Sequence, residues 1–198
     1  MRKGGISTNH PARSWRTTIK RVSGPFDVLM RVCQHGEMPT IRPAQSSDRD
    51  AIWSILEPVI RAGDTYPLPR DLSREDALSY WLAGEHEVFV AEDGEVVLGT
   101  YYLRANQHGG GSHVANCGYM TAPKATGRGV GSAMCAHSIE HARRRRFKAM
   151  QFNFVVSSND RAVRLWQRHG FRIVGNLPRA FLHPDGGYTD AYVMYREL

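Results

Sequence analysis

The sequence predicts a mixed α/β fold: a mainly antiparallel central sheet with helices on both faces and one parallel β-α-β crossover. Apolar residues recur at strand-like and helix-like spacings in the order β-α-α-β-β-β-α-β-α-β-β. Near the middle, a glycine-rich turn at 122–132 joins a strand-like segment to a long helix-like segment, and another strand-like segment follows. Strands joined through a crossover helix run parallel, so this part of the sheet contains a parallel pair.

The basic charge of the chain is concentrated at its N-terminus. The 198 residues carry a formal net charge of +7, and residues 1–37 hold seven Lys or Arg against two acidic residues. Residues 38–198 are close to balanced, so we do not expect a nucleic-acid partner. We interpret 1–37 as a basic extension without fixed structure, as a transit peptide, or as sequence ahead of a natural start at Met38. Residues 38–198 have the length and apolar content of one domain.

Cysteine usage indicates a reducing compartment, and hydropathy gives no sign of a membrane span. Cys33, Cys117 and Cys135 form no C-x-x-C pair and leave one cysteine over. No apolar run approaches the roughly 18 residues that a membrane span needs. His137 and His141 are spaced for one helix face but lack an evident third ligand, so no metal is expected. The expected location is cytoplasmic, away from any membrane.

The first half of the domain begins with a short strand at 40–43, which Pro43 ends. Ser47 is expected to cap a helix with apolar residues at i, i+3, i+4, i+7 and i+8, starting from Ile52. Pro58 should kink or break this helix. A loop at 64–69 follows, and Ser73 with Asp76 predicts the capped start of a second helix.

Strands and helices alternate in the second half. Strands at 87–92 and 96–103 are joined by Asp93-Gly94, a strong hairpin signal. After the strand at 113–121 and the glycine turn, the expected elements are a helix from 130 to about 146, a strand at 148–156, a short helix capped by Ser158 or Asn159, and strands at 171–177 and 188–195.

The glycine turn has the composition of an anion site. Gly127, Gly129 and Gly131 leave few side chains in the way, so backbone N–H groups can approach a ligand closely. The positive end of the following helix dipole lies at the same place, which favours a phosphate. The spacing fits neither the dinucleotide fingerprint nor the nucleotide-triphosphate loop.

Two motifs resemble the GCN5-related N-acetyltransferase (GNAT) superfamily. Residues 119–123 followed by Gly127-Arg128-Gly129-Val130-Gly131 resemble its acetyl-CoA signature, with Thr126 at the position of the usual Arg or Gln. Residues 159–171 resemble its Asn-x-x-Ala-x-x-Leu-Tyr-x-x-x-Gly-Phe helix. The resemblance covers 40–198. Thr65-Tyr66-Pro67, His113 through Asn116 and Phe152-Asn153 are also similar to the fungal proline-analogue (azetidine-2-carboxylate) N-acetyltransferases.

The resemblance implies acetyl-CoA as co-substrate and direct transfer of its acetyl group to an amine. Backbone amides from Arg128 to Ser132 would cradle the pyrophosphate without a metal, and a backbone N–H near Met120 would polarise the thioester carbonyl. The cofactor-binding residues it implies are Met120, Thr121, Gly127, Arg128, Gly129, Val130, Gly131, Ser132, Asn159 and Trp166.

Two departures from the family pattern bear on the mechanism. Trp166 stands where many members have a tyrosine that protonates the leaving thiolate, so we expect Trp166 to pack against the cofactor or the core. The strand at 113–120 has no carboxylate to act as base. Protons must pass through water, a backbone group or another residue. Tyr119 is a candidate acid, although a tyrosine in a strand also fits a core position.

Asn116 and Asn153 are the polar oddities of the two central strands. Either their amides satisfy backbone and water where the strands separate, or they face the substrate, with Asn116 donating to a carboxylate or carbonyl. Tyr66, in the loop after the first helix, is a further substrate-binding candidate. The function expected is N-acetylation of a small amine, such as an amino acid or proline analogue. A protein N-terminal or lysine acetyltransferase and a non-catalytic acyl-CoA-binding module are the alternatives, and the sequence leaves a homodimer open.

Overall fold

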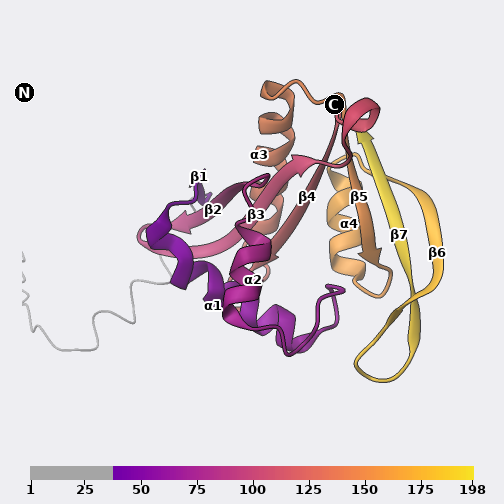
Figure 1. Ribbon diagram of the computed structural model, residues 1–198, viewed down its shortest axis with the longest axis horizontal. Helices are drawn as coiled ribbons and strands as arrows, with labels where there is room; N and C mark the ends of the chain where they lie inside the picture. Colours follow the sequence, from indigo (N-terminus) through magenta and orange to yellow (C-terminus); the bar gives the residue numbers. More distant parts are fainter. Residues whose placement is uncertain (1–37) are drawn as a thin grey trace, which may run out of the picture. The chain divides into compact units, whose positions relative to one another are not determined.

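A seven-stranded sheet organises residues 38–198, the part of the chain that the computed structural model describes (Figure 1). The extension expected at 1–37 lies outside the described residues. The strands are β1 (Thr40–Pro43), β2 (Glu87–Asp93), β3 (Val96–Ala105), β4 (Val114–Thr121), β5 (Ala149–Val156), β6 (Arg172–Leu182) and β7 (Tyr188–Glu197). They lie side by side in the order β1-β2-β3-β4-β5-β7-β6.

Four helices cover the two faces of the sheet, two on each (Figure 1). They are α1 (Arg49–Ala62), α2 (Arg74–Trp81), α3 (Val130–Arg144) and α4 (Asp160–Arg168). The first two pack together on one face, and the last two lie on the other. The predicted fold class is confirmed.

The central strands separate soon after they meet. Every neighbouring pair of strands is antiparallel except β4 and β5, which are parallel as predicted. Their pairing covers only Val114 with Ala149 and Ala115 with Met150. Beyond these residues each strand continues with its facing edge unpaired by the other. The glycine turn lies at the end of β4, so this opening leads directly to it.

Apolar periodicity correctly predicted the inner faces of the helices. In α3 the predicted inward residues are all buried: Val130, Met134, Cys135, Ile139 and Ala142. The break allowed for at Pro58 is wrong, because α1 continues to Ala62 with Pro58 inside it. Pro58 removes one N–H bond, but packing of the buried stripe outweighs that loss.

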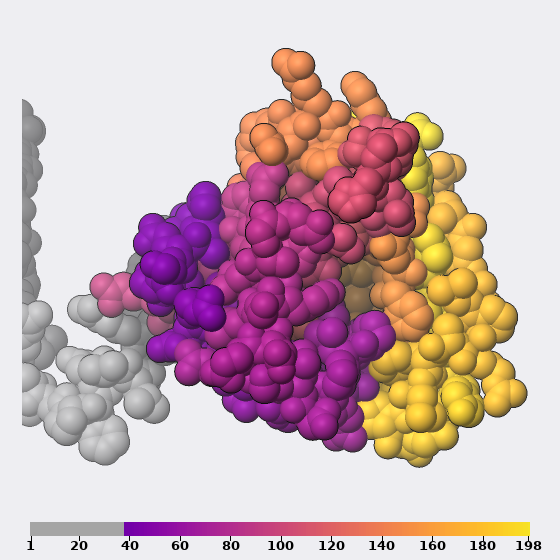
Figure 2. Space-filling view, in the orientation of Figure 1, coloured from indigo at the N-terminus to yellow at the C-terminus, as the bar shows by residue number. Residues whose placement is uncertain are grey.

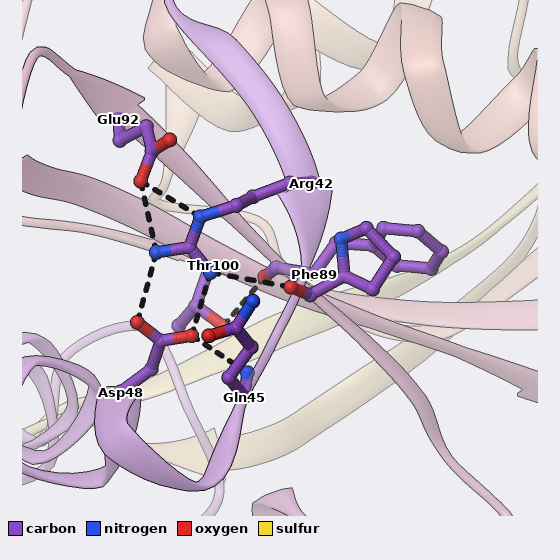
Figure 3. A network of polar contacts seen from close by, with 7 residues as sticks. Arg42, Gln45, Asp48, Phe89, Glu92 and Thr100 are labelled. Atoms are coloured by element: carbon purple, nitrogen blue, oxygen red, sulfur yellow. Dashed lines mark hydrogen bonds and ion pairs between the residues drawn. The ribbon is translucent and has the colours of Figure 1, made fainter.

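The start of α1 is held by an ion-pair network rather than by the predicted Ser47 cap (Figure 3). Ser47 lies in the short 3-10 turn η2 (Ser46–Asp48). Arg42 of β1 donates to both carboxylate oxygens of Asp48, at 2.7 and 2.9 Å, and to Glu92 of β2 at 2.9 Å. The hydrogen bonds from Arg42 lower the pKa of Asp48. This network fastens the edge strand to the first helix.

Two hairpins differ in detail from the prediction. In the β2–β3 hairpin the turn residues are Gly94 and Glu95, one position later than expected, with Gly94 at φ +60°. β6 runs five residues beyond the predicted end at 177. Its register with β7 shifts between Leu177 and Phe181, around Arg179 at φ +55°. Because of this irregularity, the second half of β6 does not continue the alternation of side chains by which a strand is predicted from a sequence.

Candidate functional site

The glycine turn presents a row of free backbone N–H groups. Gly127 and Gly129 have φ values of +86° and +79°, in the left-handed region that glycine adopts readily. The first bond of α3 runs from the Ala133 N–H to the Gly129 carbonyl, and no side chain caps the helix. Within residues 38–198 the N–H groups from Gly129 to Ser132 therefore have no acceptor. Free amides at a helix N-terminus can hold an anion, which is the role that the sequence analysis expects of this turn.

Arg128 does not belong to that row. Its N–H donates to the Ala125 carbonyl at 3.2 Å, inside the turn. Its guanidinium binds Asp93 of the β2–β3 hairpin at 2.8 Å. Arg128 thus braces the turn against the hairpin, and the amide row predicted from 128 begins one residue later.

A second arginine, which the sequence analysis did not single out, lies beside the turn. The Nη2 of Arg161 is 3.7 Å from the position that a β-carbon on Gly127 would take. Arg161 extends from the first turn of α4, and Asn159 caps that helix by accepting from the Ala162 N–H at 3.1 Å. Arg161 lies two residues after Asn159 of the sequence motif, and this position could have indicated that it lies at the turn. The Arg161 guanidinium thus adds positive charge beside the free amides of the turn.

Trp166 packs as expected. It is 8% exposed, and its ring lies 4.9 Å from that of Tyr119 and 5.0 Å from that of Phe152, centroid to centroid. The indole therefore forms a floor between α4 and the two central strands. Its edge also reaches the cavity described below.

The open edge of β4 carries its odd-numbered backbone groups. The Ala122 N–H donates to Leu98 of β3, so by alternation the groups of Met120 also face β3. Tyr119 and Thr121 therefore present their N–H and C=O groups to the opening. The Met120 N–H is used in the β3–β4 ladder, so the strand N–H groups that face the opening nearest to it are those of Tyr119 and Thr121.

The Tyr66 hydroxyl forms hydrogen bonds with both backbone groups of Tyr119, the N–H and the C=O. It accepts from the Tyr119 N–H at 2.8 Å and donates to the Tyr119 carbonyl at 2.9 Å. Burial raises the pKa of this hydroxyl, which keeps the proton that the second bond requires. A single side chain from the loop after α1 thus replaces a missing strand neighbour at this point.

The Tyr119 hydroxyl points away from the opening. It lies 2.7 Å from the Ser138 hydroxyl of α3, a fully buried residue. Burial raises its pKa well above the ordinary value for tyrosine. Of the two roles offered by the sequence, this geometry favours the core position over the acid.

The two asparagines lie in different surroundings. Asn116 is 7% exposed and its amide donates to the Gln151 carbonyl of β5 at 2.9 Å, across the separating strands. Asn153 is exposed, although its neighbours Phe152 and Val155 in β5 are buried. It donates to the Asn106 side chain at 2.7 Å and accepts from Gln151 at 2.8 Å. Asn116 thus bridges β4 and β5 where the strands separate, which is the first of the two alternatives stated for it.

One cavity joins these parts. Its volume is about 820 Å³, and Figure 2 shows the surface hollowed between the magenta and purple atoms of the α1–α2 region and the orange atoms of β5. Its wall includes Tyr66, Asn116, Tyr119 and Asn153, and every predicted cofactor residue except Arg128. At one end lie the free amides of the turn, and at the other lie the asparagines.

The charges of the wall are predominantly positive. Among residues 38–198 it contains Arg104, Arg161 and Arg168, with Asp64 as its one carboxylate. Cys117 also reaches the wall, but burial raises the pKa of its thiol to about 12. No group of three or more metal-binding side chains occurs within 38–198. None of the described helices is long and apolar enough to cross a membrane.

A family model and a curated relative match the chain. The model described as the acetyltransferase (GNAT) family matches residues 51–171. The N-acetyltransferase aca1 of the fission yeast Schizosaccharomyces pombe is 28% identical over 151 residues, which cover 68% of this chain and 72% of that protein.

Solved structures share the fold. A GCN5-related N-acetyltransferase from Kribbella flavida is 42% identical, with a TM-score of 0.77 over 80% of this chain and 97% of its own. A phosphinothricin acetyltransferase from Sinorhizobium meliloti, solved in complex with AcCoA, is 19% identical, with a TM-score of 0.73 over 82% of this chain and 89% of its own. At that identity the second likeness concerns the fold alone.

Proposed function

We propose that this chain, a member of the acetyltransferase (GNAT) family, moves an acetyl group from acetyl-CoA directly to the amine of a small molecule. The observation that carries the proposal is the cavity of about 820 Å³, whose wall runs from the free amides of the glycine turn to polar side chains of β3, β4 and β5. A cavity of this size suits small ligands.

The turn and α4 fit the phosphate end of acetyl-CoA. The pyrophosphate would lie on the free N–H groups from Gly129 to Ser132, with the Arg161 guanidinium beside it. The amide-bearing pantetheine arm matches the unpaired edge of β4, to which it would bind as an added strand. Thr121 supplies backbone groups there, and Trp166 supplies the apolar floor.

Acetyl-CoA supplies an activated thioester, and the chain supplies position and charge stabilisation. The Tyr119 N–H at the open edge is suited to donate to the thioester oxygen as negative charge develops there, which requires the Tyr66 hydroxyl to give up that N–H. A neutral amine forms the C–N bond while the C–S bond breaks. The amine's proton passes to water or to Asp64, and the leaving thiolate takes a proton from water, so coenzyme A leaves as its thiol.

Two asparagines remain acceptor-site candidates in this scheme. Asn153 is exposed at the polar end of the cavity, where it can position the attacking amine or its water. Asn116 shapes the same wall through its bond to β5.

A thiol-release assay tests the proposal. The full chain is incubated with acetyl-CoA and a panel of small amines, amino acids and short peptides, and free coenzyme A is measured over time. We expect amine-dependent release with at least one small amine. Release with peptides alone would favour a protein acetyltransferase. Binding of acetyl-CoA by calorimetry without release for any acceptor would favour a non-catalytic module.

We also expect the protein to be cytoplasmic. Gel filtration will decide whether it is a homodimer.

A further inference from the structure

Arg104 of β3 lies at the acceptor end of the cavity. Across β3 and β4 it is the register partner of Asn116, so the two side chains lie on the same face of the sheet. That face carries α1 and α2, because Tyr102, two residues before Arg104, packs on Trp81 of α2 at 4.9 Å. Arg104 and Asn116 both contribute to the cavity wall.

The guanidinium has few partners. Its Nη1 donates to Glu85 at 3.3 Å, and the side chains of Arg104 and Glu85 are 31% and 53% exposed. The Nε–H is buried without an acceptor within residues 38–198. A guanidinium has five N–H donors, so this one contact leaves most of its hydrogen-bonding capacity unused at a cavity wall.

The neighbouring amides, in contrast, are already bonded to protein groups. Asn116 donates to the Gln151 carbonyl, Gln151 donates to Asn153, and Asn153 donates to Asn106. Each of these amides uses one N–H in these bonds and keeps a second, which is a neutral donor. Arg104 adds a positive charge and several unbonded N–H donors at the same wall, and hydrogen bonds from a charged donor to a carboxylate are stronger.

We propose that Arg104 binds a carboxylate of the acceptor, and that the acceptor is therefore an amino acid, with either a primary or a ring amine. This inference rests on the proposed acetyl transfer to a small amine. Asp64 is the one carboxylate in the described wall, which also contains Arg104, Arg161 and Arg168, so the cavity suits an anionic group better than a polycation. A planar carboxylate also matches the fork of guanidinium donors.

The geometry along β4 agrees with an acceptor of this size. Asn116, the partner of Arg104, is three residues from Tyr119, whose N–H lies at the expected position of the acetyl group. Three residues of a strand span about 10 Å. An arginine side chain and a small amino acid can cover such a span together, with the carboxylate at Arg104 and the amine at the open edge.

The test compares each active amino acid with its own carboxamide, beginning with azetidine-2-carboxylate and its amide. Wild-type protein should have the higher kcat/KM for the acid. In Arg104→Gln the acid-to-amide ratio of kcat/KM should fall about tenfold or more, through the KM of the acid. Glu85→Gln, which keeps the guanidinium, should preserve the ratio. Arg104→Lys, which keeps the charge but loses the fork, should restore part of it.

Several outcomes would overturn the inference. An equal kcat/KM for acid and amide in wild-type protein does so without any variant, so the test survives a variant that fails to fold. An unchanged ratio in Arg104→Gln, or an equal fall in Glu85→Gln, assigns Arg104 to a structural pair. If no small amine releases coenzyme A, the proposed function itself fails. Acetylation of amines without preference for a carboxylate refutes the role of Arg104 alone.

Discussion

At the scale of single residues, the Tyr66 hydroxyl has the most specific environment in the cavity. It donates to one backbone group of Tyr119 and accepts from the other, a combination that a hydroxyl can provide and a phenyl ring cannot. The loop that carries Tyr66 is thereby fixed to the open edge of β4. The sequence indicated Tyr66 as a pocket residue, but its partners depend on how a loop returns to a strand 53 residues later.

Tyr66→Phe should leave the N–H and C=O of Tyr119 without their partner. We expect the free energy of unfolding, measured without acetyl-CoA, to fall by about 1–3 kcal/mol. Tyr80→Phe is the control, because the Tyr80 hydroxyl has only a 3.3 Å contact with the Tyr102 hydroxyl. Equal denaturation midpoints for the two variants would show that the paired bonds contribute little.

Asn116 and Asn153 should respond differently to removal of their amides. Asn116→Ala removes a buried bond between β4 and β5, so its main effect should be a lower melting temperature. Asn153→Ala should keep the melting temperature but lower kcat for the best acceptor, because an exposed group at the polar end would no longer position the amine. Wild-type kinetics in Asn153→Ala would exclude Asn153 from the site.

At the scale of elements, the glycine turn was predictable because its chemistry is local. Glycines before and within the first turn of a helix predict free amides from the local sequence alone. The opening beside it was not predictable in detail, since a parallel pair is implied by the crossover but its length depends on how two strands diverge. Arg104 was missed for a similar reason. Its strand was predicted, but its place beside Asn116 depends on the β3–β4 register.

Gly129→Ala tests the turn against a matched control. Gly129 and Gly94 have φ values of +79° and +60°, and an added β-carbon meets no atom within 4 Å at either position. Alanine should therefore strain both backbones similarly, by about 1–2 kcal/mol. Only Gly129→Ala should also weaken acetyl-CoA binding, by about tenfold, because its amide row shifts. Calorimetric affinities that change equally in both variants would contradict the assignment of the turn.

At the scale of the whole molecule, three histidines link stability to pH. Burial lowers the pKa values of His86, His137 and His169. One ring nitrogen of each has a polar partner: the Trp81 carbonyl for His86, the Tyr101 hydroxyl for His137 and the Ser132 hydroxyl for His169. Burial is the largest cause of the shift in all three. The folded chain therefore favours their neutral forms, while the unfolded chain binds protons at the ordinary pKa.

This difference fixes the sign of the pH dependence. Below about pH 6.5 the unfolded state binds more protons than the folded state, so stability falls as pH decreases through that value toward the lowered folded pKa values. The contribution is fully present above about pH 6.5. The melting temperature should be lower at about pH 5.5 than at pH 7.5, and His137→Gln with His169→Gln should flatten the slope. A melting temperature that rises on acidification would contradict this assignment.

The domain boundary is a further property of the whole chain. The described residues 38–198 contain the complete sheet, its helices and the cavity. We therefore propose that removing residues 1–37 leaves acetyl-CoA affinity and melting temperature nearly unchanged. A large drop in either quantity on truncation would show that the segment contributes to the domain.

We propose above all that the protein transfers an acetyl group to a small molecule bound in the cavity. The most direct measurement follows a ¹³C-labelled acetyl group from acetyl-CoA into a mixture of free amino acids, simple amines and a protein extract. After separation by size, mass spectrometry locates the label. Our account predicts N-acetylated amino acids in the low-mass fraction. Label confined to protein N-termini or lysines, with none in the low-mass fraction, would contradict it.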